Sequence, residues 1–483
     1  MTQPSVTITE LDGTLGVLPP SGVAIFALVG VSSAGTANAP ATYSRVKDIV
    51  AQFGRGPLVE AACHYVERYG NPVLLVKTAA TTVGSFDAID VTGVTGTSVA
   101  TLDTPLPDDD YEIQVSIVNG GTRGTTGITY RVSYDGGRTF GSLLALGTAT
   151  AITIANSGGV NILLAAGTLA TGDVIKVRCH APTWNSSDIG TALTALGAST
   201  VSWELVHVVG PVDATLAAAI DLKIAGFATG LAKFRAWIGN TRIPNAAESE
   251  ATYLSTLSAA FASFSTVYGS IYAGACKMIS SVSGRNYRRP AAFIAAAREA
   301  SVSQEIDIAS INLGALNCTI RDVNGNPDEH DETANPGLDD ARFAVLRTWV
   351  GFPGVYVNRP RLMSAEGSDF QLMPHRRVLN IAHSGLRNYF IKRLNKPIQV
   401  NATTGYILEE EALEIEAGAL AVMRASLLAK PKASGVQFTL SRTDNLLSTK
   451  TLTGQARVIP LGYPEFINLD LGFLNPALQV QKT

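Results

Sequence analysis

The chain contains 483 residues, and this length predicts about three folding units with a large core. Charged residues make up only 16% of the chain, against about 25% in an average soluble protein, while apolar residues make up 46%. So low a charge on so large a protein favours a subunit that buries surface against copies of itself. The net charge of −3 argues against a broad face that binds nucleic acid.

The N-terminal region contains no basic residue before Arg45 and no apolar run that ends at a cleavage site, so we expect no secretion signal. The longest early apolar stretch, Val23 to Val31, is about half the length of a membrane-spanning helix and predicts a buried strand. We therefore expect no direct membrane insertion. The cysteines are scattered singly, which favours folding in a reducing cytoplasm: Cys63, Cys179, Cys276 and Cys318.

In chain order, an extended segment comes first and an α/β segment follows. Residues 1–22 are rich in Thr, Gly and Pro, with strand-like alternation at Val6 and Ile8, so we expect an extended N-terminal arm. Residues 23–83 alternate buried strands with amphipathic helices, which indicates the first part of an α/β core. The expected elements are a strand at 24–31, a helix at 57–69 and a strand at 73–76.

Residues 84–183 change to short alternating segments separated by glycine-rich turns, which predicts an inserted all-β domain. The α/β pattern resumes over residues 184–340, so we expect one mixed sheet that is split by the insertion. Within residues 81–170, eight acidic residues and three basic residues give a balance of −5, which indicates a solvent-facing surface. The acidic residues are Asp87, Asp90, Asp103, Asp108, Asp109, Asp110, Glu112 and Asp135.

Charge is segregated along the expected C-terminal domain, residues 341–469. Residues 342–396 contain ten basic and two acidic residues, a balance of +8, and five glutamates lie in the first half of a predicted helix over 407–428. The basic segment 376–396 is either a solvated helix face or a contact with an acidic partner or with the glutamate-rich helix of a neighbour. The candidate contact residues are Arg376, Arg377, Arg387, Lys392, Arg393, Glu409, Glu410 and Glu414.

Residues 470–483 form a thin strand-like tail, which we expect to be an extended C-terminal arm.

One motif raises the possibility of glycan chemistry. Residues 133–140, SYDGGRTF, fit an Asp box, a hairpin in which the Asp135 carboxylate accepts hydrogen bonds from turn amides and Phe140 packs under the turn. The motif occurs once, without the repeat period of a sialidase-type propeller. A structural hairpin is therefore favoured over a glycan-binding or glycosidase site.

A second motif resembles a metal loop. Asp322, Asn324 and Asn326 are spaced like the first ligands of a calcium loop, but Pro327 stands where glycine is needed and Thr333 where a bidentate glutamate is needed. His330 lies among carboxylates and could complete a metal cluster, yet no second histidine is nearby. We favour a solvated surface loop over residues 317–340 and predict no metal.

Other signatures of catalysis are missing from the sequence. Gly54-x-Gly56 precedes Pro57, which lacks an amide donor, and no Lys-Ser/Thr follows, so a phosphate loop is not indicated. No HExxH or GxSxG sequence is present. His375 and His383 are the only histidines with a paired spacing, and each lies near arginine. The sequence therefore predicts neither an enzyme nor a bound cofactor.

The order of these segments carries a family resemblance. At the N-terminus it consists of residues 24–30 (AIFALVG), 43–54 (YSRVKDIVAQFG) and the helix-strand pair to Val76. At the C-terminus it consists of VYVN at 355–358, the basic and glutamate-rich helices, and PEFI at 464–467. The chain resembles the tail sheath proteins of contractile bacteriophages and related contractile injection machines, over roughly 1–80 and 340–483 and more weakly over 184–340.

The resemblance implies a structural subunit that forms stacked hexameric rings around a tail tube and contracts to drive the tube through the host cell envelope. It implies partners in further copies of the chain, the tail tube protein, and the baseplate and tail terminator proteins. It also implies that both terminal arms, residues 1–22 and 470–483, link subunits by adding strands to the sheets of neighbours. The arm residues expected to make these contacts are Val6, Ile8, Leu471, Phe473, Leu478 and Val480. It places the protein in a virion tail assembled in the bacterial cytoplasm, with the insertion on the outer surface. A genome-free bacterial injection particle is the alternative in the same class, and an Asp-box glycan-binding protein is the alternative in a different class.

Overall fold

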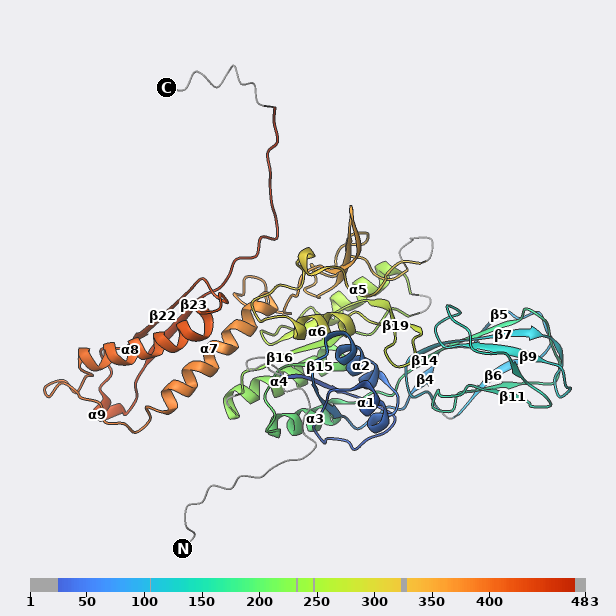
Figure 1. Ribbon diagram of the computed structural model, residues 1–483, viewed down its shortest axis with the longest axis horizontal. Helices are drawn as coiled ribbons and strands as arrows, with labels where there is room; N and C mark the ends of the chain where they lie inside the picture. The colour runs from blue at the N-terminus through green and yellow to red at the C-terminus, as the bar shows by residue number, and fades with distance from the viewer. Residues whose placement is uncertain (1–24, 105, 232, 246–247, 323–327, 474–483) are drawn as a thin grey trace, which may run out of the picture.

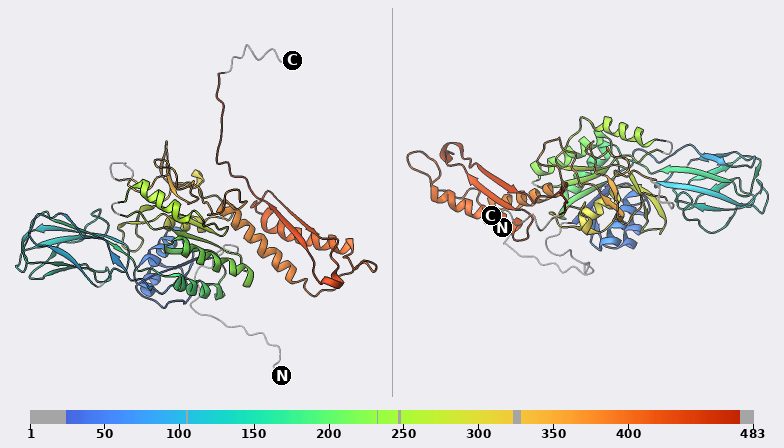
Figure 2. Two further views of the ribbon diagram at one scale, coloured as in Figure 1. Left: turned by 180° about the vertical axis from the view of Figure 1, so that it is seen from behind. Right: turned by 90° about the horizontal axis from the view of Figure 1, so that it is seen from above.

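The computed structural model describes residues 25–473 except 105, 232, 246–247 and 323–327. The described chain is elongated, with an α/β centre between an all-β segment at one end and a helical C-terminal segment at the other (Figures 1 and 2). The predicted mixed α/β class is confirmed. No helix in this part of the chain is long and apolar enough to cross a bilayer.

The centre is a six-stranded mixed sheet. Its strand order is β17-β16-β15-β1-β3-β2, in which β2 is antiparallel to β3 and the other pairs are parallel. Both β1 and β15 lie inside the sheet; β1 is a continuous apolar run, and β15 is mostly buried but contains Glu204 and His207. The strands are β1 (Ile25–Gly30), β2 (Ala41–Tyr43), β3 (Val73–Lys77), β15 (Trp203–Pro211), β16 (Ala236–Asn240) and β17 (Gly269–Tyr272).

Helices cover both faces of this sheet because alternate strand residues point to opposite sides. Phe26 and Leu28 of β1 pack against one layer of helices, and Ala27 and Val29 against the other. The first layer contains α1 (Val46–Phe53), α2 (Pro57–Tyr69) and α6 (Ala292–Ser301). The second contains α3 (Ser186–Ala198), α4 (Ala214–Gly230) and α5 (Glu250–Phe261).

Local sequence explains where these helices begin and end. Helix α2 begins at Pro57, whose fixed φ suits a first helical position, and ends at Gly70, whose φ of 68° favours glycine. Helix α3 begins with a capping box between Asn185 and Asp188. The predicted helix over 57–69 is therefore confirmed at both ends.

Between β3 and α3 the chain forms antiparallel sheets with a separate apolar core. Strand β7 shows the alternation that predicted it, with Tyr111, Ile113, Val115 and Ile117 all buried. The strands are β4 (Ser85–Phe86), β5 (Asp90–Gly93), β6 (Ala100–Asp103), β7 (Tyr111–Asn119), β8 (Gly121–Thr122), β9 (Thr129–Ser133), β10 (Leu144–Ala145), β11 (Ala151–Thr153), β12 (Asn161–Leu164), β13 (Thr168–Leu169) and β14 (Val174–His180). We call residues 84–183 the insertion.

Two hairpins and a short helix extend the centre. Strands β18 (Ala275–Ile279) and β19 (Asn286–Pro290) form a hairpin that lies next to the insertion. Strands β20 (Leu346–Trp349) and β21 (Phe352–Val357) form a second hairpin, and η1 (Ile311–Leu313) is a 3-10 turn.

The C-terminal segment has a small core of its own. Helices α7 (Met373–Ile391) and α8 (Glu409–Met423) pack against a hairpin of β22 (Gly435–Leu440) and β23 (Gly454–Ile459). Helix α8 continues as a π-helical turn, η2 (Arg424–Leu428). The short helix α9 (Leu446–Thr449) is part of the segment that connects β22 to β23. Residues 464–473 then run away from the body without regular structure (Figure 1).

Candidate functional sites: a charged junction and the C-terminal contact surfaces

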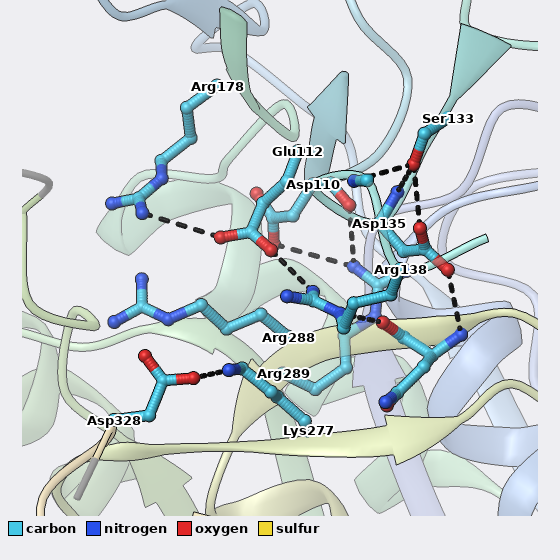
Figure 3. Close-up of polar contacts among 12 residues, drawn as sticks. Asp110, Glu112, Ser133, Asp135, Arg138, Arg178, Lys277, Arg288, Arg289 and Asp328 are labelled. Carbon is cyan, nitrogen blue, oxygen red and sulfur yellow. Dashed lines mark hydrogen bonds and ion pairs between the residues drawn. The ribbon is translucent and has the colours of Figure 1, made fainter. Parts of the chain in front are cut away.

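A cluster of buried charges lies where the insertion meets the β18–β19 hairpin (Figure 3). Arg289 of β19 is 1% exposed, and its two terminal nitrogens donate to the Asp109 carboxylate at 2.7 and 3.0 Å. Two further cations of the hairpin form ion pairs with residues of the α/β centre: Arg288 pairs with Glu329, and Lys277 pairs with Asp328. The junction therefore consists mainly of paired charges.

Beside this cluster, Glu112 of β7 forms ion pairs with two arginines of the insertion. Its carboxylate accepts from Arg138 at 2.5 Å and lies 3.4 Å from Arg178. Burial opposes ionisation, but the adjacent Arg138 lowers the pKa of Glu112 below its ordinary value. At the edge of the junction, Arg55 of the core pairs with Asp108 at 2.9 Å.

The expectation that the acidic residues of the insertion face solvent is wrong for five of the eight. These five are buried or partly buried by different contacts: two bond the β18–β19 hairpin, one pairs with Arg55 of the core, and two bond the Ala181 amide and Arg138 within the insertion. They are Asp108, Asp109, Asp110, Glu112 and Asp135.

The Asp-box turn has the expected internal bonds, since the Asp135 carboxylate accepts from the Thr139 amide at 2.8 Å and from the Ser133 hydroxyl at 2.7 Å. Phe140 does not pack beneath the turn, because it is 40% exposed. The turn instead binds β19: the Asn286 amide donates to Asp135 at 3.3 Å, and Arg138 donates to the Asn286 carbonyl at 3.0 Å. Because its oxygens are engaged in these bonds, Asp135 does not face an open sugar site.

The expected solvated loop over 317–340 is wrong for the residues around His330. The His330 imidazole is buried and lies between Glu250, which bonds Nδ1, and Glu332, whose carboxylate is 2.9 Å from Nε2. Burial alone would lower its pKa, but the bonds to both carboxylates raise the pKa of His330 to about 9. This histidine therefore carries a structural charge that ties the segment to α5.

Those catalytic and metal candidates that the structure describes are not brought together. Asn324, Asn326 and Pro327 lie outside the described residues. Across the described ranges, no group of three or more His, Cys, Asp and Glu side chains is placed to hold a metal ion. His375 bonds the Leu461 carbonyl at 3.2 Å, while His383 packs on Phe234.

Two of the predicted contact residues have roles inside the subunit instead. Arg377 of α7 is 2% exposed and bonds Glu204 of β15 and Glu299 of α6, each at 2.9 Å. Arg376 is 4% exposed and stacks over the Tyr268 ring at 4.3 Å. Since α7 packs its first turns against the α/β centre, these arginines attach the C-terminal segment and are not available to a partner.

The remaining contact candidates lie further along the C-terminal segment. Arg393 and Glu414 pair with each other at 2.8 Å, so this contact between the basic segment and the acidic helix lies within one chain, whereas the prediction placed it between neighbours. Arg442, outside the basic segment, bonds Glu409 at 2.7 Å. The other three are exposed, and no ion pair in the described part of the chain involves them: Arg387, Lys392 and Glu410.

An apolar groove of about 720 Å³ opens beside this exposed end of α7. Leu394, Ile398 and Leu446 are among its lining residues, and Lys396 and Lys450 add positive charge. The groove lies between the end of α7, α8 and the β22–β23 hairpin. It leaves apolar surface of the C-terminal segment open.

The predicted linking arms fall partly within the structure. Leu471 and Phe473 are completely exposed, on an extended segment that also exposes Phe466, Ile467 and Leu469. The other predicted arm residues, Val6, Ile8, Leu478 and Val480, lie outside the described residues. The described part of the tail therefore presents a row of apolar side chains that the subunit does not cover.

Sequence reasoning missed the partners that bury these charges. Glu60 and Glu299 are each a buried carboxyl within an otherwise apolar helix segment, and such a residue signals a buried ion pair. Arg289 stands directly before Pro290 in a buried strand and carries the same signal. Their partners could not be read from the sequence, because Asp109 and Arg289 are 180 residues apart.

Comparison with known proteins identifies the family. Residues 3–361 match the family model described as DUF2586, N-terminal domain, which is most of the chain. The chain belongs to this family. No curated protein matches the sequence of this DUF2586 protein.

Solved structures share its fold. A chain of the extracellular contractile injection system PVC sheath complex in its contracted state overlaps 99% of both chains, with 11% identity and a TM-score of 0.51. A chain of the anti-feeding prophage baseplate covers 98% of this chain and 100% of its own length, with 11% identity and a TM-score of 0.50. The sheath tail protein of Listeria innocua also aligns, at 12% identity and a TM-score of 0.46, over 92% of this chain and 97% of its own. The resemblance to contractile tail sheath proteins is confirmed at the level of the fold.

Proposed function

We propose that this DUF2586 protein is the structural subunit of a contractile sheath that polymerises around a tube and drives it through a host cell envelope. The observation that carries the proposal is the overlap of the whole chain with a chain of a contractile sheath complex. Stacked hexameric rings, a tail tube protein, and baseplate and terminator proteins as partners are parts of the same proposal. The sheath-like folds belong to structural proteins, and we propose no catalytic role.

Exposed apolar surface supports polymerisation. The tail at 464–473 places five large apolar side chains in solvent, and Val350, at the tip of the β20–β21 hairpin, is 93% exposed. A monomer rarely exposes apolar rows of this kind unless a partner covers them. We propose that residues 1–22 and 470–483 link subunits by adding strands to sheets of neighbours, with Leu471 and Phe473 as buried contacts in the assembly.

The exposed end of α7 supports a contact with the tube or with a neighbour. Arg387 and Lys392 remain unpaired within the described chain after Arg393 is taken by Glu414, so their charge is free for an acidic partner surface. We propose that Glu410 of α8 contributes to the same contact surface. The insertion, at the opposite end of the molecule in Figure 1, then lies on the outside of the sheath.

A genome-free injection particle is the second candidate. The observation that supports it is that the folds with TM-scores of 0.50 and 0.51 come from the anti-feeding prophage and from an extracellular contractile injection system. A tail virion assembled in the bacterial cytoplasm is the first candidate. Isolation of assembled particles and assay of their contents for DNA separates the two.

Truncation tests the linkage proposal. A variant without residues 464–483 should give folded, monodisperse protein that forms no striated cylinders in negative-stain images, whereas the full chain should form them. The double substitution Leu471→Ser with Phe473→Ser should weaken assembly in the same direction without shortening the chain. Cylinders of normal length from both variants would contradict the proposed linkage.

Charge reversal tests the contact surface on α7. Arg387→Glu with Lys392→Glu should impair assembly on the tube and make the remaining assembly more sensitive to salt. Lys223→Glu, an exposed lysine of α4 on the α/β centre, is the matched control and should assemble normally. If the unchanged chain, the double variant and Lys223→Glu assembled equally well across a salt series, the proposed role of this surface would be refuted.

A further inference from the structure

The buried cluster at the junction contains more acidic groups than basic groups. Arg289 is its cation, held by Asp109 of the insertion through two bonds and by the Asp110 carbonyl at 3.1 Å. Glu60 of α2, in the core, is 6% exposed, and its carboxylate accepts from the Ser280 hydroxyl at 3.0 Å. The Arg289 guanidinium therefore bonds one buried carboxyl group, from the insertion, and interacts electrostatically with a second, from the core.

Neighbouring side chains do not balance the extra carboxylate. On α2, burial lowers the pKa of His64 to about 4 and raises the pKa of the Cys63 thiol, so both are neutral near pH 7. The phenols of Tyr111 and Tyr287 also stay neutral, because burial raises their pKa values. The nearby cations are committed elsewhere: Arg288 to Glu329, Arg138 and Arg178 to Glu112, Arg55 to Asp108, and Lys277 to Asp328. Asp110, whose carboxylate is 4.0 Å from Arg289, adds further negative charge.

Burial makes the double ionisation of this cluster unfavourable. It raises the pKa of Glu60 and raises the pKa of Asp109 to about 7, against the opposing effect of Arg289. The two carboxyl groups interact through Arg289 and titrate as a pair, so the proton belongs to the cluster and not to one residue. Below neutral pH, the pair binds one proton, so Glu60 and Asp109 together carry a single negative charge beside Arg289.

We propose that the Glu60–Asp109–Arg289 cluster is a proton-dependent latch that holds the insertion against the core. With the proton bound, Glu60 and Asp109 together carry one negative charge, which the Arg289 guanidinium balances. Loss of the proton leaves a buried negative charge and sets two carboxylates against each other, which favours separation of the insertion from β19. The Asp-box contacts to Asn286 lie at the same junction and separate with it. The latch does not depend on the proposed sheath function.

The sign of the pH effect follows from the raised pKa of Asp109. In an open junction its carboxyl has an ordinary pKa near 3.8, and in the closed junction its pKa is about 7. Opening therefore releases a proton, and the stability that the latch contributes is complete at low pH and is lost as pH rises through about 7. The open population should rise about tenfold per pH unit between pH 5 and pH 7 and level off above that.

Hydrogen exchange on the full-length protein tests the latch. Peptides that cover β19 and the start of β7 should lose protection by about 50-fold between pH 5 and pH 7, after correction for the intrinsic exchange rate. Peptides from β1 and β3 report whether the whole core opens and should keep their protection. Equal protection of the junction peptides at pH 5 and pH 8 would overturn the proposal.

Two substitutions separate the proton from simple packing. Glu60→Gln removes the excess carboxylate, so the junction should stay protected at both pH values, with a change of less than about threefold. Asp109→Asn, which keeps the shape of the other partner, should flatten the pH profile in the same way and serves if the first variant folds poorly. Glu67→Gln, on the exposed face of α2, is the matched control and should keep the wild-type profile. A wild-type pH profile in both Glu60→Gln and Asp109→Asn would refute the latch.

Discussion

The attachment of α7 to the α/β centre depends on Arg377, and its removal gives the most direct energetic test of the fold. The guanidinium is buried and makes four bonds, to the Glu204 carboxylate, to the carboxylate and the carbonyl of Glu299, and to the Val302 carbonyl, at 2.9 to 3.2 Å. Arg377→Met fills much of the same volume but leaves two carboxylates and two carbonyls without this donor. Removing one partner of a buried ion pair costs about 3–5 kcal/mol, and we expect this loss in the unfolding free energy of the core.

Urea unfolding followed by tryptophan fluorescence measures this loss, because Trp203 and Trp237 are both completely buried in the core. Arg387→Met, on the exposed part of the same helix, is the matched control and should change stability by less than about 0.5 kcal/mol. The deficit of Arg377→Met should shrink at pH 5, because burial already raises the pKa of Glu299 to about 7 and its stranded carboxylate can then bind a proton.

A double variant separates the stranded charge from the lost bonds. Arg377→Met with Glu299→Gln removes the guanidinium and the fully buried carboxylate together, so it should recover part of the stability that Arg377→Met loses at pH 8. The reasoning would be refuted if Arg377→Met unfolded within about 1 kcal/mol of Arg387→Met at pH 8, or if its deficit were the same at pH 5.

Three further outcomes follow from buried or exposed side chains. The contribution of the charged His330 to stability should be complete below pH 6.5 and be lost as pH rises through about 9. His330→Gln should therefore reduce the dependence of the melting temperature on pH between pH 7 and pH 10, and an unchanged dependence would contradict the buried charge. Gly226→Ala, with open space around it in α4, should stabilise by about 0.5–1 kcal/mol, whereas Gly418→Ala in α8 should give no gain because the added carbon overlaps the Tyr389 ring; a gain at both sites would refute this contact. Phe140→Ser should change the unfolding free energy by less than about 0.5 kcal/mol, because Phe140 is 40% exposed. A larger loss would show that Phe140 packs beneath the Asp-box turn.

The sequence predicts those elements whose burial pattern is local. The apolar runs of β1 and β3 and the alternation of β7 each specify a strand within ten residues, and Pro57 and Gly70 specify the ends of α2. These features depend on near neighbours in the chain, so no tertiary information is needed to read them.

The charged sites could not be read in this way. Arg376, Arg377 and Arg387 look alike in the sequence, yet the first two are buried and the third is exposed. What distinguishes Arg377 is Glu204, which is 173 residues away in the chain and approaches only through the fold. The acidic residues of the insertion were misread for the same reason, because the basic hairpin that covers Asp109 is distant in sequence.

The way in which the insertion leaves and re-enters the core has a practical consequence. Thr82 and Thr183 form a two-way backbone pair, with the Thr82 amide donating at 3.1 Å and the Thr183 amide at 2.8 Å. The Cα atoms of such a pair are about 5.5 Å apart, so the position accepts a short turn or a replacement domain whose own termini lie that close. Excision would leave Arg289 buried without Asp109, so a graft at this position also requires replacement of that arginine by a neutral residue. The Thr82–Thr183 pair thus marks a boundary at which the insertion can be exchanged while the central sheet is kept.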